Sequence, residues 1–161
     1  MAQRDLGGKS MKEWILFAAL TMAPVAAHAE TFTFTSISKT IDFVVLDPPT
    51  PIGRPTGASI FSSSSKTMTV DGKVLASQGK CSSWFLPSGS PFGINGVCHF
   101  NDGAGPLYDV AYTCELPSKS APAIDCWGKL IGTGGAWKGR FGTLAWLSRQ
   151  DGTNQGTGQW D

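Results

Sequence analysis

Apolar and polar residues alternate along much of the chain after residue 30, with the period of two that is typical of β-strands. Residues 31–37 read Thr-Phe-Thr-Phe-Thr-Ser-Ile, so that Phe32 and Phe34 share one face. A strand with one buried face shows this pattern. Ile37 is out of step with Phe34, and we expect a bend or bulge to return it to the buried side.

Turn-forming residues divide the rest of the chain into further segments with strand character. Residues 47–57 contain four prolines and two glycines and predict a loop, while Asp71-Gly72 is a tight-turn signal. Apolar residues rarely recur at the spacing of three and four that a helix needs. We expect strands over residues 31–37, 41–46, 58–70, 73–84, 94–100, 107–115, 124–131, 141–148 and 156–160.

This succession of strands and turns predicts an all-β chain. Consecutive hairpins favour up-and-down connectivity, because neighbours in sequence become neighbours in space. Closure into a ring removes the exposed edges of an open sheet. We therefore predict a single antiparallel, mostly up-and-down β-barrel of about eight strands, with a β-sandwich as the alternative.

An export signal precedes the predicted strands. Lys12 supplies a positive charge, residues 14–22 form a short apolar run, and Ala27-His28-Ala29 has the small-x-small pattern of a cleavage site. The run is shorter than the ~20 apolar residues of a membrane-spanning helix. We expect residues 1–29 to be a signal peptide, with residues 1–10 either an extended leader or a misassigned start.

Residues 30–161 are enough for one domain with its own core. The leader holds three basic and two acidic residues, so the full-chain totals of 13 and 12 fall to 10 and 10. A net charge near zero argues against a nucleic-acid partner and against binding to anionic lipid. We expect a periplasmic or extracellular protein without membrane insertion after cleavage, and its oligomeric state stays open.

Four cysteines follow the leader: Cys81, Cys98, Cys114 and Cys126. An even number in an exported chain predicts two disulfides. A metal site is disfavoured, because there is no Cys-x-x-Cys pair and His99 is the one histidine after the leader. Pairs 81–98 and 114–126 are each symmetric about a turn-like stretch, which favours them over the possible pair 98–114.

The most distinctive motif is rich in glycine and reads Gly132-Thr133-Gly134-Gly135-Ala136-Trp137-Lys138-Gly139-Arg140-Phe141-Gly142. A phosphate-binding loop would lead into a helix, whereas residues 141–146 look like a strand. We interpret the glycines as structural: they permit positive φ angles and close backbone approach. Trp137 could then fold over the turn, and the next strand could coil tightly.

This motif resembles a stretch in the allene oxide cyclase and dirigent protein superfamily. Members carry a late Gly-x-Gly-x-aromatic-x-Gly-x-x-Gly stretch before a barrel strand, and this chain has one extra residue between Gly134 and Trp137. The resemblance implies an eight-stranded antiparallel barrel whose apolar cavity serves ring closure, stereocontrolled coupling or ligand storage. No motif of this chain matches the functional residues of the superfamily, so none is carried over.

Five residues are candidates for contact with a ligand in such a cavity: Tyr108, Tyr112, His99, Arg140 and Trp137. Tyr108 and Tyr112 share a strand face, where they either pack or aim a hydroxyl into an apolar pocket. His99 could serve as a base near neutral pH, or lie exposed at a strand end. Arg140 could stack on an aromatic ring or bind a carboxylate.

Three functions fit this sequence. We expect an exported, disulfide-stabilised barrel that binds a small apolar ligand without catalysis and without a cofactor or metal. The second is an isomerase or cyclase of the allene oxide cyclase or dirigent type that templates a reactive intermediate, which Tyr112, His99 or Arg140 would orient. The third is a sandwich module that binds carbohydrate or protein. No catalytic residue is assigned.

Overall fold

The computed structural model describes residues 29–45, 57–69, 72–86, 92–115 and 122–161. Most of the expected leader and the expected proline-rich loop therefore lie outside the described residues. The described elements are β1 (Glu30–Val45), β2 (Gly57–Thr69), β3 (Val74–Phe85), β4 (Phe92–Asn101), β5 (Pro106–Glu115), β6 (Ala123–Gly132), the 3₁₀ helix η1 (Gly135–Trp137), β7 (Phe141–Arg149) and β8 (Thr153–Trp160).

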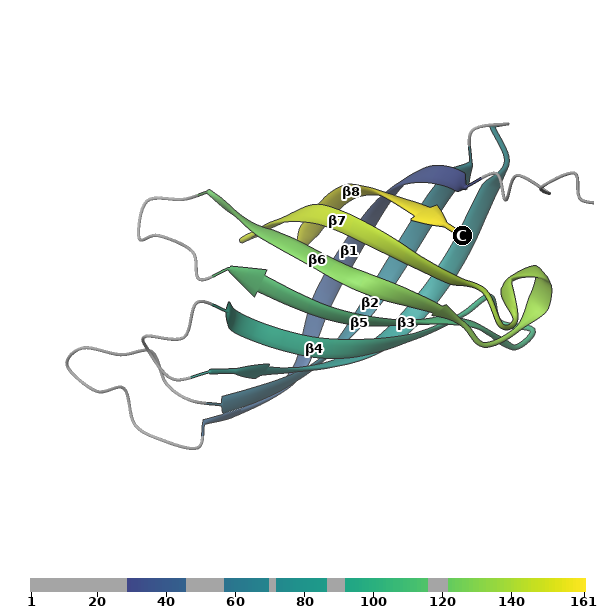
Figure 1. Ribbon diagram of the computed structural model, residues 1–161. Coiled ribbons are helices and arrows are strands. Elements are labelled where there is room, and N and C mark those ends of the chain that lie inside the picture. Colours follow the sequence, from purple (N-terminus) through teal and green to yellow (C-terminus); the bar gives the residue numbers. More distant parts are fainter. Residues whose placement is uncertain (1–28, 46–56, 70–71, 87–91, 116–121) are drawn as a thin grey trace, which may run out of the picture.

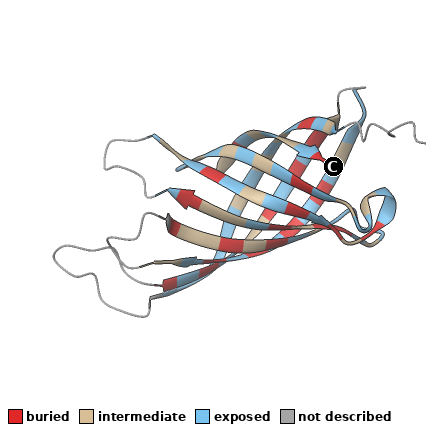
Figure 2. Ribbon diagram, in the orientation of Figure 1, coloured by how far each residue is buried: buried red, intermediate tan, exposed pale blue. Residues whose placement is uncertain are grey.

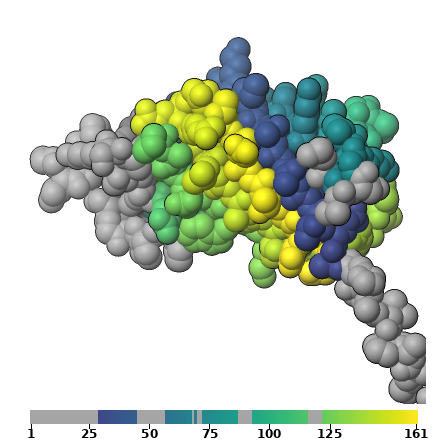
Figure 3. Space-filling model, turned by 90° about the horizontal axis from the view of Figure 1, so that it is seen from above, coloured from purple at the N-terminus to yellow at the C-terminus, as the bar shows by residue number. Residues whose placement is uncertain are grey.

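The eight strands form one closed barrel in the order in which they occur along the chain (Figure 1). Each strand pairs antiparallel with the next, and β8 pairs antiparallel with β1. Figure 3 shows this seam on the surface, where β1 lies between β8 and β2. The predicted up-and-down barrel is confirmed. The sandwich alternative is wrong, because pairing between β1 and β8 joins the two margins of the sheet.

Along β1, exposed residues alternate with buried or half-buried ones from residue 31 to residue 39, and Figure 2 shows bands of this kind along the strands. The expectation for Ile37 is wrong, since this side chain is 64% exposed. The pairing of β1 with β2 stays in register past this position, which keeps Ile37 on the outer face. The bulge comes later, between Thr40 and Asp42. Beyond it the ring of Phe43 lies 5.7 Å from that of Phe85.

Aromatic rings fill much of the interior by lying over glycines of the neighbouring strand. Phe100 is directly opposite Gly79, and Tyr112 is directly opposite Gly96. A Cβ atom on Gly96 would be 2.5 Å from the Tyr112 ring. The missing side chain therefore makes the room that a large ring needs inside so narrow a barrel.

An aromatic plug, formed by Tyr108, Trp137 and Trp160, closes one end of the barrel. The rings of Trp137 and Trp160 stack with centroids 5.6 Å apart, and Tyr108 meets both edge-on. The segment around η1 holds Trp137 in place, and Gly135 and Gly139 adopt φ angles of 56° and 81° in its turns. A side chain is strained at such angles, which explains two of the glycines in the motif.

Both favoured disulfides are confirmed. Cys81 is bonded to Cys98 across β3 and β4, and Cys114 to Cys126 across β5 and β6. Each pair is directly opposite in the strand register, with a Cα–Cα distance of 4.0 Å. Such bonds indicate an oxidising compartment. Over the described part of the chain, no helix has the length and apolar character needed to cross a membrane.

Candidate functional site

A cavity of about 250 Å³ lies inside the barrel, between the level of Phe34 and Phe100 and the end opposite the plug. Its lining comes from all eight strands. The disulfide cysteines Cys98, Cys114 and Cys126 contribute to this lining. The other apolar or aromatic side chains that line it are Phe34, Phe61, Phe85, Ile94, Phe100, Val110, Tyr112, Ile124, Leu144 and Trp146.

Hydroxyl and amide groups form a second part of the cavity wall. We name it the polar wall, and it consists of Ser36, Ser38, Thr40, Ser63, Ser83, Ser148, Gln150 and Asn154. Most of these residues belong to β8, β1 and β2, which are consecutive around the barrel. The cavity lining therefore combines oxygen-rich and ring-rich parts.

The sequence analysis missed the polar wall. Residues 62–65 are four consecutive serines, which put hydroxyls on both faces of β2 and leave no alternation to interpret. A usable signal was present on β1, where Ser36 and Ser38 continue the phase of Phe32 and Phe34. Following that phase past the aromatic residues would have placed both serines inside the barrel.

Hydrogen bonds join the members of the polar wall. The Asn154 side-chain nitrogen lies 3.1 Å from the Ser36 oxygen, 3.0 Å from the Ser38 oxygen and 3.2 Å from the Gly152 carbonyl. The Gly152 carbonyl can only accept a hydrogen bond, so the nitrogen of the Asn154 side chain, and not its oxygen, must point toward that carbonyl. Asn154 is itself buried at 8% exposure, which fixes the two serine hydroxyls at the cavity surface.

Tyr112 is the candidate residue that lines the cavity. Its ring lies edge-on to Trp146, with centroids 5.5 Å apart. Burial raises the pKa of Tyr112 to about 12, an effect that a hydrogen bond with Ser83 partly offsets. Ser83 in turn pairs with Ser59, at 2.6 Å between their hydroxyl oxygens. The Tyr112 hydroxyl is therefore protonated across the physiological range.

The buried state of Tyr112 predicts that the protein loses stability at high pH. Between pH 10 and about 12 the unfolded tyrosine releases its proton while the folded one retains it. The unfolded state then binds fewer protons, so the free energy of unfolding falls as the pH rises. We expect Tyr112 to contribute a loss of about 2–3 kcal/mol over this interval.

Urea unfolding at a series of pH values, with the Tyr112→Phe variant beside the wild type, tests this expectation. The variant retains Tyr108, and burial also raises the pKa of Tyr108. Of the pH dependence that the two buried tyrosines cause, the variant therefore keeps only the part due to Tyr108. Equal pH slopes for the two proteins would show that Tyr112 ionises normally in the folded state.

Tyr108 and Trp137, two further candidates, belong to the plug and not to the cavity. The Tyr108 hydroxyl lies 3.2 Å from the Ser77 hydroxyl, and its ring stacks on Phe100 with a centroid distance of 5.0 Å. The packing interpretation therefore describes Tyr108 well, while Tyr112 lies four residues further along the same face of β5 and borders the cavity.

Arg140 lies at the plugged end of the barrel, where it links residue 30, at the start of β1, to residue 161, which follows β8. Its guanidinium donates to the Glu30 carboxylate at 2.8 Å and to the Asp161 backbone carbonyl at 3.3 Å. The same group lies 5.7 Å from the ring centroid of Trp160. Arg140 thus stacks on an aromatic ring and binds a carboxylate, and both partners belong to the protein.

His99 lies on the outer face of β4. Its side chain is 70% exposed, and its Nδ1 atom is 2.8 Å from a carboxylate oxygen of Asp109, the opposite residue on β5. The neighbouring Cys98 points inward, as the alternation predicts. The described structure therefore separates His99 from Tyr112 by the thickness of the barrel wall.

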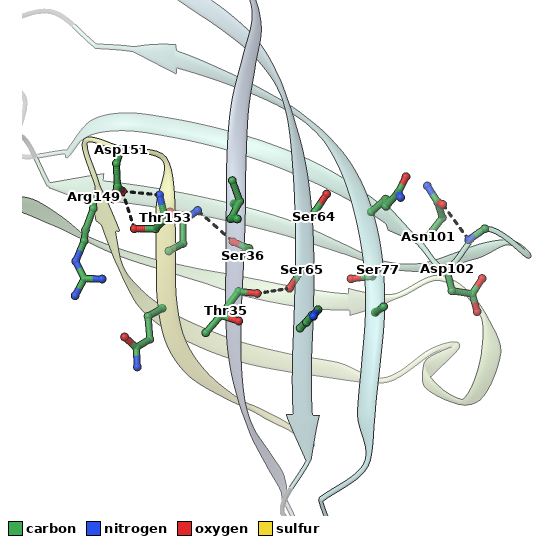
Figure 4. Close-up of a pocket in the computed structure, with 17 residues that line it drawn as sticks. Thr35, Ser36, Ser64, Ser65, Ser77, Asn101, Asp102, Arg149, Asp151 and Thr153 are labelled. Carbon is green, nitrogen blue, oxygen red and sulfur yellow. Dashed lines mark hydrogen bonds between the residues drawn. The ribbon is translucent and has the colours of Figure 1, made fainter.

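A shallow depression of about 780 Å³ lies along β1, β2 and β3 and the turn before β8 (Figure 4). Arg149 and Asp151 lie at one side, and Asn101 and Asp102 at the other. Hydrogen bonds from the Thr153 hydroxyl and backbone amide lower the pKa of Asp151. None of the described residues that line this depression is aromatic, so it offers less for an apolar ligand than the interior cavity does.

The fold and the cavity define the class of this protein: a disulfide-bonded, eight-stranded antiparallel β-barrel with a space inside it. We compared the chain with protein-family models, with curated proteins and with solved structures, and none of the three comparisons gave a match.

Proposed function

We propose that this protein, once exported, binds a small and largely apolar molecule in the barrel cavity and does not transform it. The observation that carries the proposal is the interior space of about 250 Å³ lined by rings, aliphatic side chains and disulfide sulfur. A dry apolar cavity of about 150 Å³ holds benzene. The barrel cavity accordingly suits a ligand of one or two fused rings.

The chemistry of the lining supports binding over catalysis. Among the described residues that line the cavity, none carries a carboxylate or an imidazole. Tyr112 has its pKa raised away from neutrality, to about 12. A general acid or base works best with a pKa near the working pH. The isomerase or cyclase alternative would require such a group beside the ligand.

Two further proposals accompany this function. Residues 1–29 act as the export signal, which the two disulfides support because such bonds persist in oxidising compartments. A relationship to the allene oxide cyclase and dirigent superfamily is supported by the closed eight-stranded barrel and by the glycine-rich turn at its end. A periplasmic or extracellular location follows from the first of these proposals.

A variant that fills the cavity tests ligand binding. Ile94 on β4 lines the cavity, so the Ile94→Trp variant places an indole in the space that the ligand needs. We expect naphthalene, followed by two-dimensional NMR titration, to bind the wild type and to bind this variant at least tenfold more weakly. Protein interiors are closely packed, so an indole that fills the cavity leaves no room for the naphthalene ring.

Val97→Trp is the matched control, because Val97 is on the same strand but does not line the cavity. It should bind naphthalene as the wild type does. Near-ultraviolet circular dichroism verifies that both variants are folded. Wild-type protein that shows no saturable shift with naphthalene, or an equal loss in both variants, would overturn the proposed site.

A further inference from the structure

We infer that the molecule bound in the cavity is not a cation and carries a hydrogen-bond acceptor, such as a carbonyl or ether oxygen, on one edge of an apolar ring. This inference rests on the proposed function and specifies its ligand class. It follows from the position of the polar wall, from the direction of its hydrogen bonds, and from the charge of the cavity lining.

The polar wall and the ring-rich part of the lining border the same cavity. Ser36 and Ser38 come from β1 and Asn154 from its neighbour β8. Tyr112 on β5 and Trp146 on β7 supply rings to the other part of the lining. A ligand that contacts both parts needs an apolar face for the rings and a polar edge for the serines, because a buried hydroxyl without a partner is costly.

The hydrogen bonds of the polar wall determine what that edge must be. The Asn154 side-chain nitrogen has two N–H groups and three acceptors within reach, namely the oxygens of Ser36 and Ser38 and the Gly152 carbonyl. A serine oxygen that accepts one of these hydrogen bonds keeps its own O–H group as a donor. The wall therefore presents donors to the cavity, and the complementary ligand group is an acceptor.

The cavity also selects against positive charge. None of the described residues of its lining carries a carboxylate, and its one charged side chain is that of Arg149, which is exposed. A cationic ligand inside the barrel would be removed from water without a counter-ion. That desolvation penalty is larger than a pair of hydroxyl contacts can offset.

Indane and 1-indanone form a matched probe pair, because they differ only in the replacement of a methylene group by a carbonyl. In a purely apolar cavity indane would bind more tightly, since it is the more hydrophobic molecule. We expect the wild type to bind 1-indanone at least as tightly as indane in NMR titrations. The positively charged 1-aminoindane should bind at least tenfold more weakly than the ketone.

The variant Ser36→Ala/Ser38→Ala removes the donors from the cavity. We expect it to shift the preference by about tenfold toward indane, through weaker binding of the ketone. The control variant Ser62→Ala/Ser64→Ala alters two serines of β2 that do not line the cavity and should keep the wild-type preference. The wild-type comparison needs no variant and decides the question even if the inner substitutions prevent folding.

The outcomes separate this inference from the function on which it rests. Tighter wild-type binding of indane, or equal binding of 1-aminoindane and 1-indanone, would overturn the ligand class while leaving a ligand-binding cavity. An unchanged preference in folded Ser36→Ala/Ser38→Ala protein would overturn the assignment to these serines. Failure of all three probes, together with failure of naphthalene, would overturn the proposed function itself.

Discussion

Replacing Cys81 and Cys98 together by alanine will lower the free energy of unfolding by about 3 kcal/mol. The bond between Cys81 and Cys98 joins residues with a sequence separation of 17. The bond between Cys114 and Cys126 joins residues with a sequence separation of 12. The conformational entropy that a cross-link removes from the unfolded chain grows only with the logarithm of this separation. The second pair should therefore contribute nearly as much as the first.

Urea unfolding monitored by circular dichroism measures both losses. Reduction of the wild type by a phosphine is the control, because it breaks the same bonds without removing any side chain. We expect the reduced wild type to lose the sum of the two contributions. A loss of less than about 1 kcal/mol in either double variant would mean that the unfolded chain is already restricted there without the bond.

Introducing a side chain at Gly96 will destabilise the barrel by about 3 kcal/mol or more. In Gly96→Val the new Cβ atom would be 2.5 Å from the Tyr112 ring and 2.6 Å from the Ser82 backbone carbonyl. Backbone of a neighbouring strand cannot move aside cheaply, so the ring must shift. Since Tyr112 lines the cavity, we also expect naphthalene binding to weaken at least tenfold.

Gly105→Val is the matched control for this substitution. Among the described residues, apart from Gly105 itself and its two neighbours in the chain, no atom lies within 4 Å of the Cβ position of Gly105. This variant should unfold within about 1 kcal/mol of the wild type and retain naphthalene binding. Wild-type stability in Gly96→Val would show that Tyr112 does not lie over the bare backbone of β4.

The candidate site was predictable in part. The shared face of Tyr108 and Tyr112 was read correctly from their spacing, and Cys98 was placed correctly on the face opposite His99. The heights of Tyr108 and Tyr112 along the barrel axis were not predictable. Their different heights place Tyr108 in the plug and Tyr112 at the cavity. Strand tilt and stagger determine these heights, and both arise only when the barrel closes.

The failed expectation for Ile37 has the same origin. Local alternation suggested that a bulge would bury this residue, yet the pairing with β2 continues in register and leaves it exposed. A hydrogen-bonded neighbour determines where a strand changes phase, and one strand alone carries no information about its neighbour. Serines on both faces of β2 concealed the polar wall for a related reason.

By itself, the amino-acid sequence determined that this chain is all-β with antiparallel hairpins, and it favoured a barrel and two cross-strand disulfides, because period-two alternation, turn residues and symmetric cysteine spacing are local properties. The tertiary structure alone decided which inward-facing residues form the plug and which line the cavity. It also decided that Arg140 binds Glu30, 110 residues away. Such contacts join residues that are distant in the chain, and only closure of the sheet brings them together.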